Sequence, residues 1–244
     1  MVIALTHFGS DEFLPLLKLW VDRYLLSGTA LDVVVLADMK VKVPDIFEHH
    51  NPGDRKRFTV ARFDPIPDII RPDQPFDMKG SLILCGLQLL QNERVLLVDS
   101  DAFFVKNPAQ ALAYMDGAFF MGEDPMTRYI RGINGEIKER NAGVLFFGTT
   151  SYADRSAIQT KYLENFKALL PANDDALLEQ VVWTKTWHDL RDCGISKELP
   201  RSLNWSYIWG RSDDRTIILH EHGPQKWAKV PGANLKSQAY NLFK

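Results

Sequence analysis

Residues 94–104 of this 244-residue chain have the sequence RVLLVDSDAFF, an apolar run that ends in two acids. Val95 to Val98 are typical of a short strand that is buried on both faces of a parallel sheet. Because side chains two apart on a strand point the same way, we expect Asp99 and Asp101 to converge while Ser100 faces elsewhere. Two convergent carboxylates form half of a divalent-cation site and favour a hard ion such as Mn²⁺ or Mg²⁺. The run therefore predicts a metal-binding edge of a sheet.

The rest of the chain has to support this reading, because about one or two Asp-x-Asp matches arise by chance at this aspartate content. Apolar strands alternate with helical patterns, which predicts an α/β fold with a mostly parallel central sheet and helices on both faces. The polar, glycine-containing residues 123–140 predict a mobile loop. Strands are predicted at residues 2–8, 31–36, 58–63, 95–98, 118–121, 143–147 and 216–219, and helices at about 11–27, 79–91, from 107, 151–169 and 174–188.

Composition narrows the classes of function. With 45% hydrophobic and 25% charged residues, the chain suits a single domain over residues 1–244. Its net charge of -2 gives no general attraction for polyanions, so we expect no nucleic-acid partner and at most peripheral membrane association. Cys85 and Cys193 lack metal-ligand spacing and predict neither a disulfide framework nor a zinc site. With no apolar run of membrane-spanning length and no leader, we expect a soluble, cytoplasmic protein.

A histidine near the C-terminus is the candidate third metal ligand. Ligands of open α/β sheets bind beyond the carboxyl ends of the strands, where His220 would join Asp99 and Asp101 if its strand runs parallel to theirs. The competing interpretation is a histidine that only hydrogen-bonds the backbone. Gly223 and Lys226 follow it, and a glycine lets backbone approach a ligand while a lysine neutralises phosphate oxygens.

Four short motifs carry a family resemblance. Residues 220–227 (HEHGPQKW) resemble the closing motif of the glycogenin-like, family-8 glycosyltransferases of GT-A fold, although the family's proline before the tryptophan is missing. Residues 99–101 resemble the family's Asp-x-Asp, and residues 141–145 (NAGVL) resemble its stretch facing the donor and acceptor sugars. Residues 174–178 (DDALL) resemble the family's Asp-Gln-(Gly/Asp)-(Ile/Leu)-Leu, the fourth motif, and Lys79 matches a basic residue that contacts the donor in the family. The motifs keep the family's order.

The resemblance implies a metal-dependent transfer of a hexose, with retention, from a nucleotide sugar to a glycan, glycolipid or protein acceptor. UDP-glucose and UDP-galactose are the implied donors. Nucleotide binding is expected in about residues 1–106, and the acceptor and closing elements in about 107–244. The implied metal ligands for Mn²⁺ or Mg²⁺ are Asp99, Asp101 and His220; the donor-binding residues are Thr6, His7, Phe8, Asp38, Lys79, Ser100, Gly143, Gly223 and Lys226; and the catalytic residues are Asp175, Asp174 and Asn141.

One residue departs from the family in the catalytic region. Asp175 stands where the family has a glutamine near the anomeric carbon. A carboxylate is a better nucleophile and a better stabiliser of positive charge than an amide. We hypothesise that Asp175 stabilises or briefly traps the sugar cation.

Several residues also have ordinary structural interpretations. Asn141 suits a turn before a strand, and Asp174 and Asp175 suit the cap of a helix. Lys79 could be a solvated helix residue. The aromatic residues at 205, 207 and 209 could stack on a sugar or pack in the core.

Two other classes of function share the same motif. An apolar strand running into Asp-x-Asp also opens the haloacid-dehalogenase-like phosphatases, with Asp99 as the nucleophile and Asp213 and Asp214 as late acids. Against that class, the motif lies far from the N-terminus and lacks the hydroxyl residue that usually follows. The third class is a domain that binds a nucleotide sugar without turnover.

Overall fold

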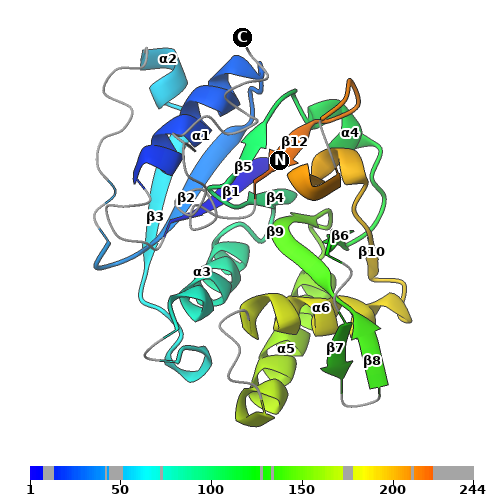
Figure 1. The fold of residues 1–244 in the computed structure, drawn as a ribbon. Coiled ribbons are helices and arrows are strands. Elements are labelled where there is room, and N and C mark those ends of the chain that lie inside the picture. The colour runs from blue at the N-terminus through cyan, green and yellow to red at the C-terminus, as the bar shows by residue number, and fades with distance from the viewer. Residues whose placement is uncertain are drawn as a thin grey trace, which may run out of the picture.

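The structure is a computed structural model that describes residues 1–7, 14–41, 43, 52–71, 74–126, 129–132, 135–172, 178–209 and 212–221. Its centre is a seven-stranded sheet with the strand order β10-β6-β9-β4-β1-β2-β3 (Figure 1). The strands β1, β2, β3 and β4 are parallel neighbours, whereas β9 runs antiparallel to both β4 and β6. The seven strands are β1 (Val2–His7), β2 (Asp32–Asp38), β3 (Phe58–Phe63), β4 (Val95–Val98), β6 (Phe119–Glu123), β9 (Arg140–Phe147) and β10 (Ser196–Glu198).

Helices pack on both faces of this sheet, as the alternating pattern predicts. Figure 1 shows α1 on one side of the first strands and α3 on the other. The α-helices are α1 (Leu14–Leu26), α2 (Pro52–Arg55), α3 (Pro75–Leu89), α4 (Ala109–Ala113), α5 (Tyr152–Leu169) and α6 (Leu178–Arg191). Short 3-10 turns occur at Pro67–Ile69, Leu170–Ala172, Arg201–Leu203 and Tyr207–Trp209.

Strand β4 is buried on both sides, and its side chains alternate between two hydrophobic clusters. Val95 and Leu97 pack with α3, α5 and α6, whereas Leu96 and Val98 pack with α1. Burying four aliphatic side chains on a strand this short stabilises the fold by about 1.5–3 kcal/mol per side chain. This burial fixes the end of β4, and therefore the start of the acidic motif, in the middle of the molecule.

The observed elements refine several predicted boundaries. Helix α3 begins at Pro75, a proline at the first helical turn, so Lys79 lies inside the helix rather than at its start. Strand β9 begins at Arg140, which puts Asn141 within a strand and excludes the turn interpretation of that residue. Ser151 caps α5 by accepting a hydrogen bond from the Asp154 backbone N–H, in agreement with the predicted start.

The prediction of a mobile loop over residues 123–140 was wrong. Tyr129–Gly132 (β7) and Gly135–Lys138 (β8) form a two-stranded antiparallel hairpin. The polar composition is misleading because a ribbon that stands apart from the main sheet has no large face to bury; Tyr129 is 61% exposed. The regular alternation of the segment is therefore weak.

A second, small sheet carries the late histidine. It has the strand order β11-β12-β5, with β11 (Trp205–Ser206), β12 (Ile218–His220) and β5 (Ala102–Phe104). Strand β12 runs antiparallel to β5. This pairing brings the histidine to the acidic motif, because β5 follows that motif directly.

Candidate active site

The acidic motif forms a tight turn between two strands. The Asp99 backbone N–H donates to the Gly143 carbonyl at 2.8 Å, and the Ala102 N–H donates back to the Asp99 carbonyl at 3.0 Å. Asp99 and Asp101 therefore converge because the chain turns at Ser100, and not through the alternation of an extended strand. The prediction that the two carboxylates converge is confirmed, although its stated cause was wrong.

His220 lies beside the acidic turn. In the antiparallel register it is paired with Ala102, and the next backbone N–H, of Glu221, donates to the Asp101 carbonyl at 2.9 Å. The His220 Nε2 atom lies 3.4 Å from Asp101 Oδ1. One ligand atom from each of Asp99, Asp101 and His220 lies within 4.8 Å of the others. This is the three-residue set that the sequence predicts.

The chemistry of this set fits a divalent cation. Asp99 Oδ1 is buried without a hydrogen-bond partner, a state that costs free energy unless a cation or donor is supplied. Burial raises the pKa of the Asp99 carboxyl; the Lys79 ammonium opposes that shift and the Asp101 carboxylate adds to it. Two carboxylates with one imidazole suit Mn²⁺ and similar ions, and leave positions open for substrate oxygens.

Lys79 is buried against the acidic turn, which excludes its interpretation as a solvated helix residue. Its ammonium donates to Asp99 Oδ2 at 2.9 Å and to the Ala142 carbonyl at 3.1 Å. Glu179 Oε2 lies 3.6 Å from the same nitrogen. Burial alone would lower the pKa of Lys79, but the carboxylates of Asp99 and Glu179 outweigh it and hold the pKa above its ordinary value. The ammonium therefore stays charged and fixes the Asp99 side chain.

Glu179, in the first turn of α6, is a site residue that sequence reasoning missed. It is 4% exposed, and its Oε1 atom is buried without a partner. The pKa of Glu179 is raised to about 7. Burial is the main cause; the Lys79 ammonium opposes the shift and the Asp99 carboxylate adds to it. Nothing in the local sequence distinguishes this glutamate from a solvated helix residue, because its burial depends on contact with α3.

The raised pKa of Glu179 predicts a pH dependence of stability. In the folded protein the carboxyl holds its proton to about pH 7, whereas the unfolded chain releases it near the ordinary glutamate pKa of 4.5. Raising the pH through this window therefore costs stability, by up to about 3 kcal/mol. Urea unfolding of the wild type and Glu179→Gln should diverge between pH 4.5 and 7, with the variant more stable at pH 7. Parallel pH curves would contradict this assignment.

Gly143 makes room for the imidazole of His220, the predicted third metal ligand. A Cβ atom at this position would lie 1.9 Å from His220 Cε1 and 2.6 Å from Nε2. The same residue accepts the Asp99 backbone hydrogen bond. Gly143 was predicted to bind the donor, and in this structure it packs directly against the predicted metal ligand.

We therefore expect Gly143→Ala to displace His220 and to weaken Mn²⁺ binding by about 10- to 100-fold. Calorimetric titration of the protein with Mn²⁺ measures the change. Gly86→Ala is the matched control, because its Cβ would lie 2.5 Å from Leu36 Cδ1 in the core, away from the site. It should cost stability and leave Mn²⁺ affinity unchanged. Equal affinities for all three proteins would contradict the role given to Gly143.

A second group of polar side chains missed by sequence reasoning adjoins the site through strand β9. Gln180 accepts a hydrogen bond from the Ala142 N–H at 3.3 Å and donates to Glu139 Oε1 at 2.6 Å. Its amide nitrogen also lies 3.5 Å from Asp124 Oδ2. Both acids are buried. Because Ala142 also accepts from Lys79, this group and the acidic turn share one segment of backbone.

Some of the remaining predicted donor-binding residues lie at the edge of the sheet beside the acidic turn, and the others lie outside the described residues. Thr6 and Asp38 are buried at the carboxyl ends of β1 and β2, on the same edge of the sheet as Asp99, and Asp38 accepts a hydrogen bond from the Lys40 N–H. Ser100 is half-buried in the acidic turn. For His7 only the backbone is described, as the last residue of β1. Phe8, Gly223 and Lys226 lie outside the described residues, as do the predicted catalytic residues Asp174 and Asp175.

The late aromatic residues pack partly against one another. Trp205 is half-buried against the core cluster around α1, and its ring meets that of Trp209 edge-on at 5.9 Å between centroids. The Arg201 guanidinium lies over the Trp209 ring. Core or loop packing therefore accounts for these two rings.

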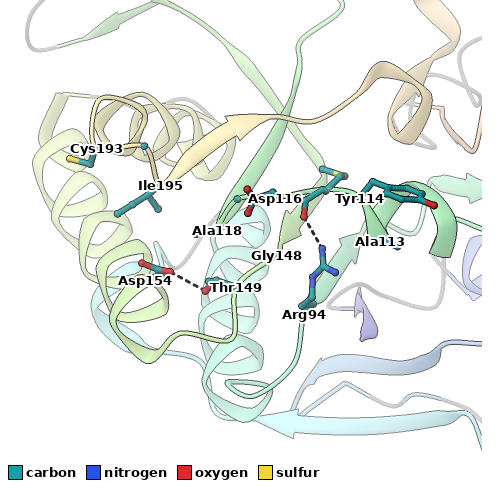
Figure 2. A pocket seen from close by; sticks show the side chains of 13 residues that line it. Arg94, Ala113, Tyr114, Asp116, Ala118, Gly148, Thr149, Asp154, Cys193 and Ile195 are labelled. Atoms are coloured by element: carbon teal, nitrogen blue, oxygen red, sulfur yellow. Dashed lines mark hydrogen bonds between the residues drawn. The ribbon is translucent and has the colours of Figure 1, made fainter.

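A hollow of about 680 Å³ lies at the opposite end of the sheet (Figure 2). It is lined by Arg94, which precedes β4, and by Gly148, which follows β9. The Arg94 guanidinium donates to the Leu112 and Met115 carbonyls. Because Asp99 follows β4, the strand separates this hollow from the acidic turn.

No helix among the described residues is both long and apolar enough to cross a bilayer.

No family model and no curated protein sequence matches this chain. Solved structures do: an active-site variant of LgtC, at 14% identity, covers 99% of this chain and 96% of its own with a TM-score of 0.65. The galactosyltransferase LgtC in complex with donor and acceptor sugar analogs matches at 15% identity over the same shares of both chains, with a TM-score of 0.63.

A third match comes from a mammal. The apo form of mouse xyloside xylosyltransferase 1 matches 91% of this chain and 98% of its own, at 11% identity and a TM-score of 0.59. At identities this low, a structural match shows the fold alone, and the three structures have the same fold. Over nearly its whole length, this chain therefore has the GT-A fold of glycosyltransferases that its sequence motifs predicted.

Proposed function

We propose that this protein is a glycosyltransferase that moves a hexose from a nucleotide sugar to an acceptor hydroxyl with the help of a divalent cation. The observation that carries the proposal is the meeting of Asp99, Asp101 and His220, from two distant parts of the chain, at the carboxyl edge of a GT-A sheet. Ligands of open α/β sheets bind at this edge. The LgtC complex with donor and acceptor sugar analogs supports a sugar donor and a sugar acceptor.

The proposed division of labour follows the two halves of the chain. Residues of about 1–106 would bind the nucleotide, with Thr6 and Asp38 on the same sheet edge as the acidic turn. Asp99, Asp101 and His220 would hold Mn²⁺ or Mg²⁺, an ion that neutralises a diphosphate leaving group. Lys79 donates to Asp99, and its positive charge would add to that of the ion as the diphosphate gains negative charge.

The donor is proposed to be UDP-glucose or UDP-galactose, and the acceptor a glycan, glycolipid or protein hydroxyl. The second half of the chain, about residues 107–244, would supply the acceptor contacts. We also propose a cytoplasmic location; free thiols such as Cys85 and Cys193 are compatible with a reducing compartment. Retention of configuration at the anomeric carbon follows from the family resemblance.

Asp175 remains the proposed stabiliser of the sugar cation. We expect Asp175→Asn to lower the transfer rate, because the amide neither attacks the anomeric carbon nor balances its positive charge as a carboxylate does. Initial-rate measurements together with the product's anomeric configuration test this. Near-full transfer with unchanged stereochemistry would contradict the hypothesis.

A panel of nucleotide sugars, assayed for nucleotide release with Mn²⁺ and with EDTA, tests the proposed function. We expect metal-dependent release from one UDP-hexose, and faster release when a suitable acceptor is added. Release from no donor would overturn the proposal and would favour a domain that binds without turnover. Hydrolysis of p-nitrophenyl phosphate without nucleotide dependence would favour the phosphatase class instead.

The phosphatase class receives no support from the contacts of its proposed late acids. Asp213 is paired with Arg215 and accepts a hydrogen bond from the Arg215 N–H. The Asp214 carbonyl accepts from Lys106. These are contacts of a surface turn, and the matching solved structures are glycosyltransferases.

A further inference from the structure

A chain of buried hydrogen bonds leads from the backbone of β9 to the histidine of the proposed metal site. It begins at Gly143, whose backbone N–H donates to Asn141 Oδ1 at 2.9 Å. A backbone N–H can only donate, so the side-chain atom of Asn141 at this position must be the oxygen. The orientation of the Asn141 amide is thereby fixed.

The Asn141 oxygen then fixes the orientation of a second amide. Asn204 Nδ2 donates to the same Asn141 Oδ1 at 3.1 Å. With its nitrogen directed to Asn141, Asn204 presents its oxygen, Oδ1, to His220 Nδ1 at 3.0 Å. An amide oxygen only accepts, so Nδ1 of the imidazole must carry the proton. In the neutral ring, Nε2 is then left with its lone pair.

That lone pair faces the acidic turn. His220 Nε2 lies 3.4 Å from Asp101 Oδ1, so two electron-pair donors face one another, as the ligands of a cation do. We propose that Asn204, oriented by Asn141, is a positioning residue that holds His220 in the Nδ1-protonated tautomer and so presents Nε2 to the metal. The inference deepens the proposed function and rests on it for the identity of the metal site.

Two glycines create the space that this arrangement requires. Gly143 leaves room for the imidazole itself, and a Cβ at Gly122 would lie 2.8 Å from Asn204 Nδ2. Gly122 lies at a register shift in the pairing of β6 with β9. Asn204 is 3% exposed. Its backbone N–H donates to the Arg201 carbonyl, so its backbone is fixed as well as its side chain. A buried amide with both ends of its side chain satisfied is a specific orienting contact.

The inference also gives Asn141 a different task. The family resemblance places this residue toward the sugars, whereas here its oxygen accepts two internal hydrogen bonds. Asn141 would act through Asn204 and His220 and need not touch the donor. The histidine and both asparagines come from three separate segments, so local sequence patterns do not reveal the connection.

The tautomer is measurable without any substrate. In protein labelled with ¹⁵N-histidine, long-range ¹H–¹⁵N correlation spectra distinguish Nδ1-protonated from Nε2-protonated rings. The chain has 6 histidines, and the signals of His220 are those lost in His220→Gln. We expect the metal-free wild type to show His220 as the Nδ1-protonated tautomer where the ring is neutral. An Nε2-protonated His220 in the wild type would overturn the inference.

Two variants test the part played by the asparagines. Asn204→Ala should release the tautomer and weaken Mn²⁺ binding by about 10- to 100-fold, the usual cost of removing a partner of a metal ligand. Asn141→Asp retains an oxygen that accepts both hydrogen bonds, so it should preserve the wild-type tautomer. If the tautomer stays unchanged in Asn204→Ala with native-like ¹H–¹⁵N spectra, Asn204 does not position the ring.

These measurements are separable from the test of the proposed function. An Nδ1-protonated His220 in a protein that releases no nucleotide would leave the hydrogen-bond assignment standing and overturn only the enzymatic proposal. Metal-dependent nucleotide release with an Nε2-protonated His220 would support the enzymatic proposal and overturn the hydrogen-bond assignment.

Discussion

Asp101→Asn is expected to reduce metal-dependent nucleotide release by about 10³-fold, which corresponds to about 4 kcal/mol of transition-state stabilisation. The substitution replaces a charged oxygen ligand with a neutral amide of the same shape. Asp101 Oδ1 lies 3.4 Å from His220 Nε2, so this carboxylate stands beside both other members of the set. Initial rates over a series of Mn²⁺ concentrations measure the effect.

The matched control is Asp116→Asn. Asp116 lines the hollow at the opposite end of the sheet (Figure 2). Its substitution removes the same charge as Asp101→Asn, but at a distance from the acidic turn. It should leave both the rate and the Mn²⁺ dependence unchanged. If Asp101→Asn retained the wild-type rate at every Mn²⁺ concentration, Asp101 would not be a metal ligand in the reaction.

Lys79→Met is expected to lower the free energy of unfolding by about 3–5 kcal/mol. The ammonium is buried between the carboxylates of Asp99 and Glu179, at 2.9 and 3.6 Å. Removing it leaves buried negative charge without its partner, a loss that the apolar methionine does not offset. Urea unfolding at pH 7.5, followed by circular dichroism, measures the change.

Lys161→Met provides the comparison for a surface pair. Lys161 contacts Glu164 one turn away on α5, where both side chains are exposed to solvent. Its removal should cost no more than about 1 kcal/mol. Equal, small losses for the two variants would show that the buried lysine does not neutralise the acidic turn.

The parts of the fold that were predictable from sequence are those set by local burial. Strand β4 has four aliphatic residues with no polar interruption, because both of its faces are covered by the two hydrophobic clusters. Such a run is a clear signal, and the acids that follow it mark the end of the strand. The Ser151 cap of α5 is equally local.

The parts that were not predictable depend on contacts between distant segments. The direction of β12 follows from its pairing with β5, which no local pattern encodes. The hairpin of β7 and β8 was mistaken for a loop because its strands pair with one another and cover little of the core. Composition reflects burial, and a strand with little burial resembles a loop.

The candidate site shows the same division. Asp99, Asp101 and His220 follow or end buried strands and could be selected from the sequence. Glu179 and Asn204 could not be selected in this way. The burial of Glu179 depends on the packing of α6 against α3. The role of Asn204 depends on the side chain of Asn141, 63 residues away. Asp175, Gly223 and Lys226 remain predictions, since they lie outside the described residues.

The most direct test of the account is the binding of UDP to the purified protein, measured by calorimetry with Mn²⁺ and again with EDTA. If Asp99, Asp101 and His220 hold a cation that in turn holds a nucleotide diphosphate, UDP should bind with one-to-one stoichiometry in Mn²⁺ and at least about tenfold more weakly in EDTA. The same gain from Mn²⁺ should be absent in Asp101→Asn. Equal UDP affinity with Mn²⁺ and with EDTA, or no UDP binding under either condition, would contradict the account.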